Sequence, residues 1–531
     1  MRPIDPTVRQ SIERALVERD IGRAASLAQD ALVKGQRDPM LLNLAAWKRE
    51  EEGEFDASLD LLEEALQLAP GDPNIIGAIG AVMRKQGKLS EALHRLDEAI
   101  RLDPTAAAPW LERGMALETG GSLEAALASY HRAAELDPQS ASAFGGLASV
   151  ASRRGDLDVA QHFGERALAL DPFDPPGAAG LARTRIERHQ PEQALAVLEP
   201  VLATDLRDEN LANLASLKGD ALDRLGRFDE AFAAYSAANE ANARRFDRLG
   251  TAVENQRDFA DRLGREFAAI EDWPVDEPDG SPAPAFLIGY PRSGTTLVEN
   301  ALASIPGIEA LEERPTLAAG EPFLREGGLA RLAEADAEQL NALRSAYWGY
   351  VAAAGIDVAG KLFLDKDPLK GVALPLIARL FPAARIIVMR RDPRDVVWSC
   401  FKSNFAPTPA AAEFTDLERA ARHYDAVMRA QEQFLTALPL ARHELHYEEL
   451  VSDFDRETQA LTGFLGADWS EGIRDFAATA RRRGVSTMSA GQVSKPLYDG
   501  SGQWRRYAEQ LRPILPTLEP WVERFGYAGS Q

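Results

Sequence analysis

A period of 34 residues in the first half of the chain constrains its fold more than any other feature of the sequence. Prolines, glycines and alanines each recur at this interval, in three columns that share one register. The columns are Pro70, Pro104, Pro138 and Pro172; Gly53, Gly87, Gly121 and Gly155; and Ala31, Ala65, Ala99, Ala133 and Ala167. Three columns in one period indicate that one structural unit is repeated along the chain.

Each repeat is expected to be a helical hairpin. Residues 89–100 show the spacing of apolar residues that is typical of an amphipathic helix. In such a hairpin glycine permits the tight turn, alanine lets the two helices approach closely, and proline ends the second helix. The period and these positions resemble tetratricopeptide repeats. The resemblance implies an α-helical solenoid of about six repeats over residues 1–243.

The function expected of such a solenoid is binding. Repeat arrays of this kind present a concave groove that holds a peptide or a partner protein. The resemblance therefore implies an acceptor protein or peptide in the groove. The alternative is that the array only stabilises or dimerises the chain, which would make a homo-oligomer.

Composition excludes several classes of partner. The net charge of the 531 residues is −22 and no basic tract stands out, so nucleic acids and acidic membranes are poor partners. Cys400 is the only cysteine, which excludes an internal disulfide and a cysteine-based metal cluster. The first residues lack the apolar core of a signal peptide, and no apolar run is long enough to span a membrane. A cytoplasmic protein is expected.

The second half of the chain reads as an α/β domain. A charged helix is expected over 244–273, and the proline-rich stretch 274–284 marks a boundary, so residues 244–282 are interpreted as a linker and 283–531 as the second domain. Short apolar runs then alternate with helical patterns. The runs are 285–288, 361–365, 385–389 and, more weakly, 444–447, and the helical segments are 335–354, 370–380, 393–403 and 415–437. This alternation predicts a mostly parallel sheet with ligands at the carboxyl ends of its strands.

The turn after the first apolar run has the spacing of a phosphate-binding loop. Gly289 and Gly294 bound it, and a helical pattern follows. Strand, glycine-bounded loop and helix together aim backbone N–H groups at a phosphate. The loop ends Gly-Thr-Thr where a nucleotide triphosphatase has Gly-Lys-Thr, and Arg292 offers a cation for a phosphate that has no metal beside it.

A second anion site is predicted after the run 385–389. Arg391 precedes a helical segment, and Ser399 lies about two turns further on. An aspartate after a strand can hold the metal of an ATPase, but the adjacent arginines disfavour a cation here. The alternative for Arg391 is a surface ion pair with Asp392 or Asp395. Two separate phosphate sites indicate a nucleotide that is phosphorylated at two positions.

At this point the chain resembles the sulfotransferases that use 3′-phosphoadenosine 5′-phosphosulfate (PAPS), most closely the tyrosylprotein branch and its bacterial relatives fused to tetratricopeptide repeats. The resemblance covers about 283–510. Six pieces match in order: Pro291–Thr296, Glu312-Glu313, Lys366–Pro368, Arg391–Ser399, Tyr447 and Gln492–Pro496.

The resemblance implies a role for each matching residue. PAPS is the co-substrate, and no metal is required. The residues implied to hold its 5′-phosphosulfate are Arg292, Ser293, Gly294, Thr295 and Thr296. The residues implied to hold the 3′-phosphate or to close over the nucleotide are Arg391, Ser399, Tyr447, Gln492, Val493 and Lys495. Lys366 is implied to stabilise the leaving oxygen; the alternative is an exposed loop lysine.

The base that accepts the acceptor's proton is expected to be a carboxylate. No histidine occurs between His189 and His423, which disfavours imidazole near the phosphate loop. Glu313 lies 21 residues after Arg292, the interval of the tyrosylprotein branch, where a glutamate is the base. Glu312 is the competing candidate, and would otherwise cap a helix.

The chain departs from the family pattern at three places. The arginine expected four residues after Ser399 is Ser403, with Lys402 adjacent. The lysine expected before Trp504 is Gln503, with two arginines following. Arg314 and a proline follow the acidic pair, at a position that contacts a peptide acceptor, and this leaves the acceptor class open between peptidyl tyrosine and other hydroxyls.

Two other functions compete with a sulfotransferase. One is a repeat scaffold whose second domain binds the nucleotide without turnover. The other is a P-loop kinase or ATPase, which the missing Gly-Lys-Ser/Thr ending disfavours.

Overall fold

The computed structural model describes residues 3–18, 20–249, 255–278, 280–483, 493 and 497–529. By its internal contacts the chain divides into two compact units, Met1–Leu225 and Gly226–Gln531. The first unit is entirely helical in its described part, and the second contains a parallel sheet.

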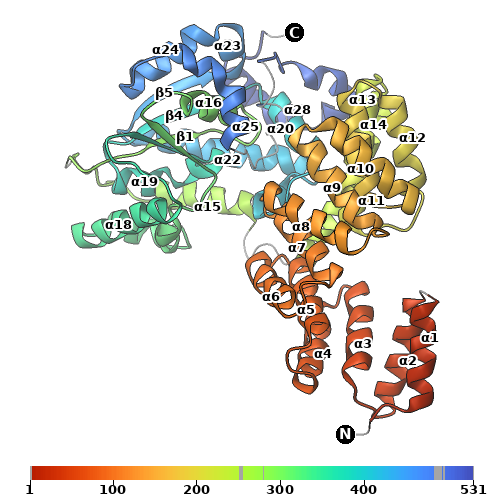
Figure 1. The fold of residues 1–531 in the computed structure, drawn as a ribbon. Coiled ribbons are helices and arrows are strands. Elements are labelled where there is room, and N and C mark those ends of the chain that lie inside the picture. The colour runs from red at the N-terminus through yellow and green to blue at the C-terminus, as the bar shows by residue number, and fades with distance from the viewer. Residues whose placement is uncertain are drawn as a thin grey trace. The chain divides into compact units, whose positions relative to one another are not determined.

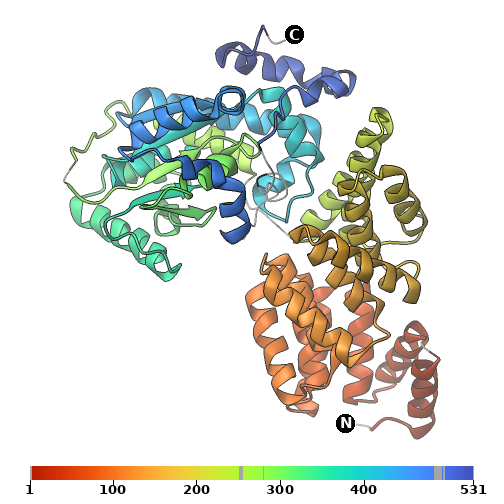
Figure 2. The same ribbon diagram turned by 45° about the horizontal axis from the view of Figure 1, so that its top comes forward.

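Helices α1 to α13 make up the first unit, and Figures 1 and 2 show them as successive antiparallel hairpins. Their bounds are α1 (Pro6–Val17), α2 (Ile21–Val33), α3 (Pro39–Glu51), α4 (Phe55–Leu68), α5 (Pro73–Lys85), α6 (Leu89–Leu102), α7 (Ala107–Thr119), α8 (Leu123–Leu136), α9 (Ala141–Arg154), α10 (Leu157–Leu170), α11 (Pro175–Glu187), α12 (Pro191–Leu202) and α13 (Asp208–Arg224). The predicted helical solenoid is confirmed.

The three columns of the repeat have the structural roles predicted for them. The glycines at the turns have positive φ, between 79° and 84° for Gly53, Gly87, Gly121 and Gly155. This left-handed region is costly for residues with a Cβ. The alanines of the column are at most 2% exposed. Each proline lies two residues beyond the end of a helix, for example after α6.

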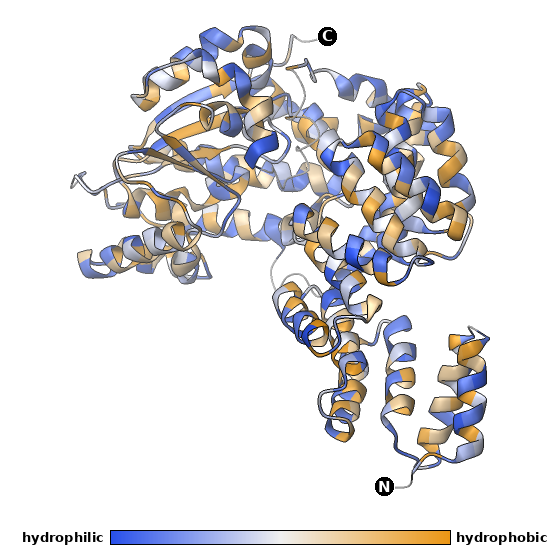
Figure 3. Cartoon of the chain, viewed as in Figure 1, coloured by the Kyte–Doolittle hydropathy of each residue, from blue (hydrophilic) through white to orange (hydrophobic). Residues whose placement is uncertain are grey.

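Several first helices of the hairpins begin with the same two residues. In α3, α5 and α11 an aspartate is the N-cap, and its carboxylate accepts a hydrogen bond from a backbone N–H of the first turn. A proline follows in the first turn, where its missing N–H has no helical partner to lose. Figure 3 shows apolar and polar stripes alternating on these helices, because each buries only one stripe between its neighbours.

In its described part, the second unit contains five strands and the helices that follow α13. The strands are β1 (Ala285–Ile288), β2 (Ile308–Glu312), β3 (Leu362–Lys366), β4 (Arg385–Arg390) and β5 (Ala441–His446). The α-helices are α14 (Phe228–Leu249), α15 (Gln256–Ala268), α16 (Thr295–Leu302), α17 (Gly328–Ala333), α18 (Ala337–Ala353), α19 (Leu374–Leu380), α20 (Pro393–Lys402), α21 (Pro409–Glu413), α22 (Leu417–Ala437), α23 (Tyr447–Ser452), α24 (Phe454–Leu465), α25 (Phe476–Arg483), α27 (Ala508–Leu511) and α28 (Leu515–Arg524). The 3₁₀ helices are η1 (Ala318–Phe323), η2 (Pro368–Ala373), η3 (Glu471–Asp475), η4 (Gln503–Tyr507) and η5 (Arg512–Ile514).

The strands form one sheet in the order β2-β3-β1-β4-β5, and every neighbouring pair is parallel. Helices cover both faces (Figure 1). On one face Leu287 and Leu364 belong to the same apolar cluster as residues of α16, α24 and α25. On the other, the ring of Phe286 packs against those of Tyr347 and Phe381. Because side chains alternate along a strand, the short apolar β1 is buried on both sides.

Two elements differ from the sequence prediction. Strand β2 was not predicted, because its sequence Ile-Glu-Ala-Leu-Glu is short and carries two glutamates. The single helix expected over 244–273 is replaced by α14 and α15. Asn255 has an extended backbone and its side chain accepts from Asp258 N, so a new helix begins there.

Helix α14 belongs by its contacts to the second unit, although the sequence register of the repeats ends near residue 243. It packs on α20, where the ring of Phe232 stacks on that of Phe401. Asn239 also donates from Nδ2 to the carbonyl oxygen of Phe401 at 2.7 Å. Helix α14 therefore supports the helix that carries Ser399.

Candidate functional site

The predicted site residues that lie in the described part of the chain gather at the carboxyl edge of the sheet. Parallel strands all end at the same edge, so the loop after β1 and the residues that end β2, β3, β4 and β5 become neighbours there. Gln492 and Lys495, which were also predicted to bind the nucleotide, lie outside the described residues.

The loop between β1 and α16 needs both of its glycines. A Cβ at Gly289 would lie 2.7 Å from the carbonyl oxygen of Met389, and one at Gly294 would lie 2.9 Å from Cδ2 of Tyr447. Gly294 is also the N-cap of α16, with φ at 109°. The loop therefore lies directly against β4 and the first residue of α23, closer than any side chain at these positions would allow.

The polar residues of this loop are buried. Ser293, Thr295 and Thr296 are 2–4% exposed, and the two threonines form the first turn of α16. Arg292 has a positive φ of 70°, which is uncommon for a residue with a side chain. Its backbone strain is the kind found where a chain binds a ligand.

The two predicted anion sites are contiguous. Nε of Arg292 donates to Oγ of Ser399 at 3.0 Å, and NH1 of Arg391 donates to the carbonyl oxygen of Arg292 at 2.9 Å. The second guanidinium therefore lies behind the first. Burial lowers the pKa of Arg292, and the positive charge of Arg391 lowers it further. Two neighbouring, half-buried guanidiniums favour an anion of more than one negative charge.

Arg391 does not form the surface ion pair considered as the alternative. Its NH2 donates to the carbonyl oxygen of Gly500 at 2.7 Å, and its Nε is buried without a hydrogen-bond partner among the described residues. Asp392 pairs instead with Arg394, and Asp395 accepts from the backbone N–H groups of Gly502 and Trp504. A buried N–H with no partner is costly, and a phosphate oxygen would satisfy it.

Tyr447 connects this cluster to the segment 498–500. Its ring lies 4.6 Å from the Arg391 guanidinium carbon, and its hydroxyl donates to the carbonyl oxygen of Tyr498 at 3.3 Å and accepts from Gly500 N. Val493 is 6% exposed and belongs to the apolar core that contains Tyr447. Of the residues predicted to close over a nucleotide, Tyr447 thus lies against Arg391, and its role in binding stays a prediction.

The second cluster lies where β2 and β3 end side by side. The register pairs Glu312 with Lys366, and Lys366 is completely buried, so it is not an exposed loop lysine. Its Nζ lies 2.7 Å from Oε1 of Glu313 and 3.5 Å from Oε1 of Glu312. A third carboxylate oxygen, Oε2 of Glu299 in α16, lies 3.4 Å away. Glu312 is the last residue of β2.

These contacts set the protonation of the cluster. Burial alone would lower the pKa of Lys366, but the carboxylates of Glu299, Glu313 and Glu312 outweigh it and raise that pKa. Burial raises the pKa of Glu313, and the charge of Lys366 opposes the rise. Lys366 is therefore a firmly protonated cation beside a carboxylate of increased basicity.

Glu313 is held in a strained backbone conformation. Its φ is 44°, and its backbone N–H donates to the carbonyl oxygen of Lys366 at 2.7 Å. The next residues are fixed by a buried polar group. Lys370 donates to the carbonyl oxygen of Arg314 at 3.0 Å and to Oγ1 of Thr316 at 2.9 Å, and it pairs with Asp365.

Comparison with known proteins identifies both parts of the chain. Residues 284–471 match the model of the sulfotransferase family, and residues 82–141, 121–175 and 151–218 match models of the tetratricopeptide repeat. The chain joins tetratricopeptide repeats to a sulfotransferase-family domain. This agrees with the resemblance found in the sequence.

Three relatives illustrate the likeness. An uncharacterized protein of Aquifex aeolicus (strain VF5) is 30% identical over 254 residues, or 45% of this chain and 32% of that protein. Protein-tyrosine sulfotransferase 1 of Danio rerio is 26% identical over 259 residues, covering 46% and 71%. Nodulation protein NoeE of Sinorhizobium fredii (strain NBRC 101917 / NGR234) is 29% identical over 221 residues, covering 36% and 52%. The matched stretch thus spans only 32% of the first of these relatives.

The sequence did not single out two residues of the sulfotransferase domain that contact the cluster. Glu299 was part of the helical pattern after the phosphate loop, and Arg483 ends α25. NH2 of Arg483 donates to Oε1 of Glu299 at 2.8 Å and to the carbonyl oxygen of Ala310 at 2.9 Å. A glutamate among the apolar residues of a short helix was the one available signal, because a buried carboxylate requires a cation or several donors.

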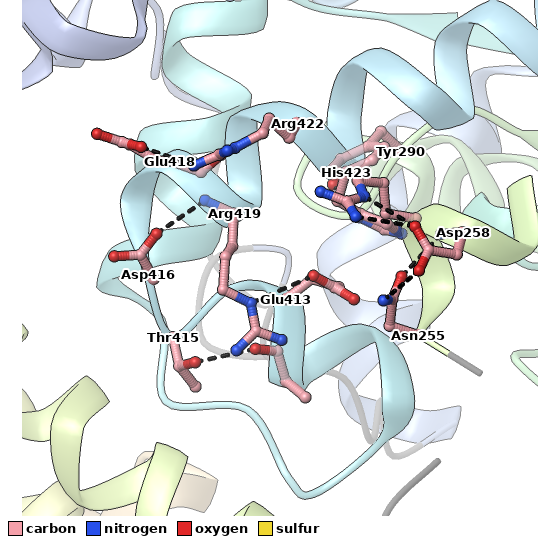
Figure 4. A network of polar contacts seen from close by, with 12 residues as sticks. Asn255, Asp258, Tyr290, Glu413, Thr415, Asp416, Glu418, Arg419, Arg422 and His423 are labelled. Carbon is pink, nitrogen blue, oxygen red and sulfur yellow. Dashed lines mark hydrogen bonds and ion pairs between the residues drawn. The ribbon is translucent and has the colours of Figure 1, made fainter. Parts of the chain in front are cut away.

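A cavity of about 270 Å³ lies away from these residues. Its lining residues are Asn255, Arg257, Glu413, Arg419 and Arg422. Figure 4 shows that the charges around it are matched: Arg419 pairs with Glu413, and Arg422 with Glu418. Arg257 pairs likewise with Asp258. Because each arginine already has a carboxylate, the cavity offers no unmatched charge to a ligand.

Metal and membrane features complete the description. In the described ranges, no three His, Cys, Asp or Glu side chains are grouped so that they could hold a metal ion. The same part of the chain has no helix with the length and apolar character needed to cross a membrane.

Proposed function

We propose that the second unit transfers the sulfuryl group of PAPS to an acceptor hydroxyl. The observation that carries the proposal is the contact between Lys366 and Glu313 at the sheet edge that also bears the phosphate loop. A cation and a base side by side are what sulfuryl transfer requires. The match of residues 284–471 to the sulfotransferase family supports this reaction class.

The arginine cluster fits the nucleotide of PAPS. Arg292 and Arg391 are two half-buried cations, and the hydroxyl of Ser399 and the Nε of Arg391, which has no partner among the described residues, add donors. We assign the 3′-phosphate to Arg391 and Ser399, and the 5′-phosphosulfate to Arg292 and the first turn of α16. In the segment Gln492–Pro496, Gln492, Val493 and Lys495 are proposed to close over the nucleotide.

The residues of the second cluster would carry the chemistry. PAPS supplies the sulfuryl group and leaves as adenosine 3′,5′-bisphosphate (PAP) when the bond between sulfur and its bridging oxygen breaks. The acceptor oxygen forms the new bond to sulfur, and its proton passes to a carboxylate oxygen of Glu313. Lys366 supplies positive charge where the leaving oxygen becomes negative.

The exposures of the two glutamates favour Glu313 as the base. The side chain of Glu313 is 42% exposed, whereas that of Glu312 is 14% exposed. An acceptor must reach the base from solvent. The part of the side chain that is covered by neighbouring atoms loses hydration, which raises the pKa of Glu313 and brings it nearer to the neutral range where a base is most effective.

The acceptor and its recruitment are further parts of the proposal. The relatives include proteins named protein-tyrosine sulfotransferase in Danio rerio and Gallus gallus, which supports peptidyl tyrosine as one acceptor. The tetratricopeptide repeats are of a kind that holds proteins, and we propose that they recruit the acceptor.

Binding and transfer are tested separately. Calorimetry should show PAP binding to the wild type, and Arg391→Ala should weaken it roughly 10- to 100-fold, because hydrogen bonds to charged groups contribute about 1.5–3 kcal/mol. Arg474→Ala is the matched control, since Arg474 pairs with Asp455 on the surface. Equal PAP affinity in the wild type and Arg391→Ala would contradict the assignment.

Transfer is measured by incubating the full chain with labelled PAPS and a fractionated native lysate. Label that moves to a protein, glycan, lipid or small molecule supports the reaction and identifies the acceptor class. PAP binding without any transfer would favour the silent scaffold. Binding of ATP and Mg²⁺ without PAPS binding would favour a P-loop kinase or ATPase.

A further inference from the structure

Helix α16 carries a buried carboxylate, Glu299, that has no direct role in the proposed chemistry. Glu299 is 0% exposed, and its helix neighbours Leu297, Val298 and Ala301 belong to the apolar core. Its Oε1 accepts from NH2 of Arg483 at 2.8 Å, and its Oε2 lies 3.4 Å from Nζ of Lys366. A buried carboxylate is tolerated only when it is paired, so Glu299 joins the two cations in the interior of the domain.

Lys366 thus has two very different carboxylate neighbours. The side chain of Glu313 is 42% exposed and can meet an acceptor, whereas that of Glu299 is 1% exposed and cannot. A base loses its negative charge when it accepts a proton. Glu313 then ceases to be an anionic partner of Lys366 at the moment when charge develops on the leaving oxygen. Burial raises the pKa of Glu299 and the charges of Lys366 and Arg483 oppose the rise, but no acceptor reaches this carboxylate to protonate it.

We propose that Glu299, held by Arg483, is a positioning residue that keeps the Lys366 ammonium in place and remains its counter-ion while Glu313 accepts the acceptor's proton. The inference rests on the proposed function, because it assigns roles within the same reaction. Glu299 contacts neither nucleotide nor acceptor in this proposal. It acts through Lys366.

The charges around Lys366 make the proposal measurable. Three carboxylates face Lys366: Glu299 from α16, and Glu312 and Glu313 at the end of β2. Asp367, the next residue in the sequence, is a fourth acidic neighbour, and Arg483 of α25 pairs with Glu299. Removing the charge of Glu299 removes one of the contributions that raise the pKa of Lys366. The alkaline limit of turnover, where Lys366 loses its proton, should then move to lower pH.

The experiment compares Glu299→Gln with Glu413→Gln in the full chain. Glu413 is likewise buried and paired with an arginine, but it lies on the cavity outside the proposed site. We expect Glu299→Gln to slow turnover of PAPS roughly 10- to 100-fold, as a misplaced catalytic group does. We also expect PAP affinity to change less than about 2-fold, because Arg391 and Ser399 are untouched. Glu299→Asp should restore part of the rate.

A crystal structure of Glu299→Gln gives a readout besides activity. We expect the Lys366 ammonium to leave its place beside residue 299 and to remain with Glu313. An ammonium in the wild-type position, or wild-type turnover with an unmoved alkaline limit, would overturn the positioning role and leave sulfuryl transfer intact. If the wild type neither binds PAP nor turns over PAPS, the proposed function fails, and the role of Glu299 fails with it.

A second variant protects the test against misfolding. If Glu299→Gln melts below the assay temperature, Arg483→Gln tests the same positioning role. This variant removes the cation that holds Glu299 and leaves the carboxylate of Glu299 in place. Slower turnover with an unchanged PAP affinity supports the proposal. Turnover and alkaline limit equal to those of the wild type overturn it.

Discussion

The repeat unit and the sulfotransferase domain are built on contacts of different reach. In the repeats, Oγ of Ser58 donates to the carbonyl oxygen of Ala46, 12 positions away, and Arg84 pairs with Glu112, 28 positions away. At the proposed site, Lys366 meets Glu313 across 53 positions, and Arg292 meets Ser399 across 107. The packing of the first unit is thus mainly between helices that are adjacent in sequence, although the exposed pair of Arg207 with Glu51 spans 156 positions. The site is made by segments that only the folded sheet brings together.

This difference predicts how substitutions act. In an array whose repeats contact mainly their neighbours, a lost contact weakens one local interface. At the sheet edge, one side chain joins several distant segments, so its loss affects chemistry with little effect on the repeats. Substitutions in each unit can therefore test that separation.

Glu313→Gln should have the largest effect on function. Removal of a general base costs roughly 10²–10⁴ in rate, and glutamine keeps the shape of the side chain. In the wild type, the rate should fall on the acidic side as Glu313 is protonated, at a pH above the usual pKa of 4.5 because burial raises the pKa of this residue. The pH dependence of kcat/KM measures both effects. Glu309→Gln, in the same strand but paired with Lys361 at the surface, is the control.

If Glu313→Gln lowers the rate by less than about 2-fold, the decrease is much smaller than the decrease expected from loss of a general base. Glu312 would then become the candidate base. Such a result would leave the comparison between the two units in place and change only the residue that carries the chemistry.

Leu96→Ala should have the largest effect on the repeat unit. Leu96 in α6 is 0% exposed, and Leu→Ala in a core costs about 2–5 kcal/mol. Thermal melting should show the loss, while PAP affinity stays at the wild-type value. Leu102→Ala, at the exposed end of the same helix, is the control. If Leu96→Ala abolishes PAP binding, the stability of the repeats and the PAP site are coupled, which would contradict the proposed separation of the two units.

Gly87→Ala should have the smallest effect. The residue has φ at 80° with nothing within 4 Å of an added Cβ, so the cost is backbone strain alone, about 1–2 kcal/mol. Gly22→Ala, inside α2, should change stability in the opposite sense, because alanine favours a helix by up to about 1 kcal/mol over glycine. Denaturant unfolding of both variants measures the difference, and equal shifts would contradict the role of the turn glycines.

The sequence predicted features that depend on local contacts better than features that depend on long-range contacts. The 34-residue period predicted where the helices of the repeats lie, because each recurring residue meets a local structural requirement. At Gly121 that requirement is a turn with positive φ. The parallel sheet was predicted from short apolar runs, but β2 was missed because Glu309 and Glu312 interrupt its pattern. The contact between Arg292 and Ser399 joins two predicted anion sites, yet no spacing along the chain states that they touch.

Glu299 and Arg483 show where sequence reasoning ended. They are 184 positions apart, and nothing local in either segment requires a partner of opposite charge. Only the packing of α16 against α25 makes the pair. A motif can name the residues that face a ligand, whereas the residues that support them depend on the three-dimensional fold.

The positive φ of Glu313 has a consequence for engineering. Of the three described residues other than glycine with positive φ, two are Arg292 and Glu313. Glycine at either position would relieve strain of about 1–2 kcal/mol. A screen for thermal stability alone would therefore select substitutions that remove the proposed base and the arginine of the β1–α16 loop. Screens for stability in this domain should include an assay of turnover.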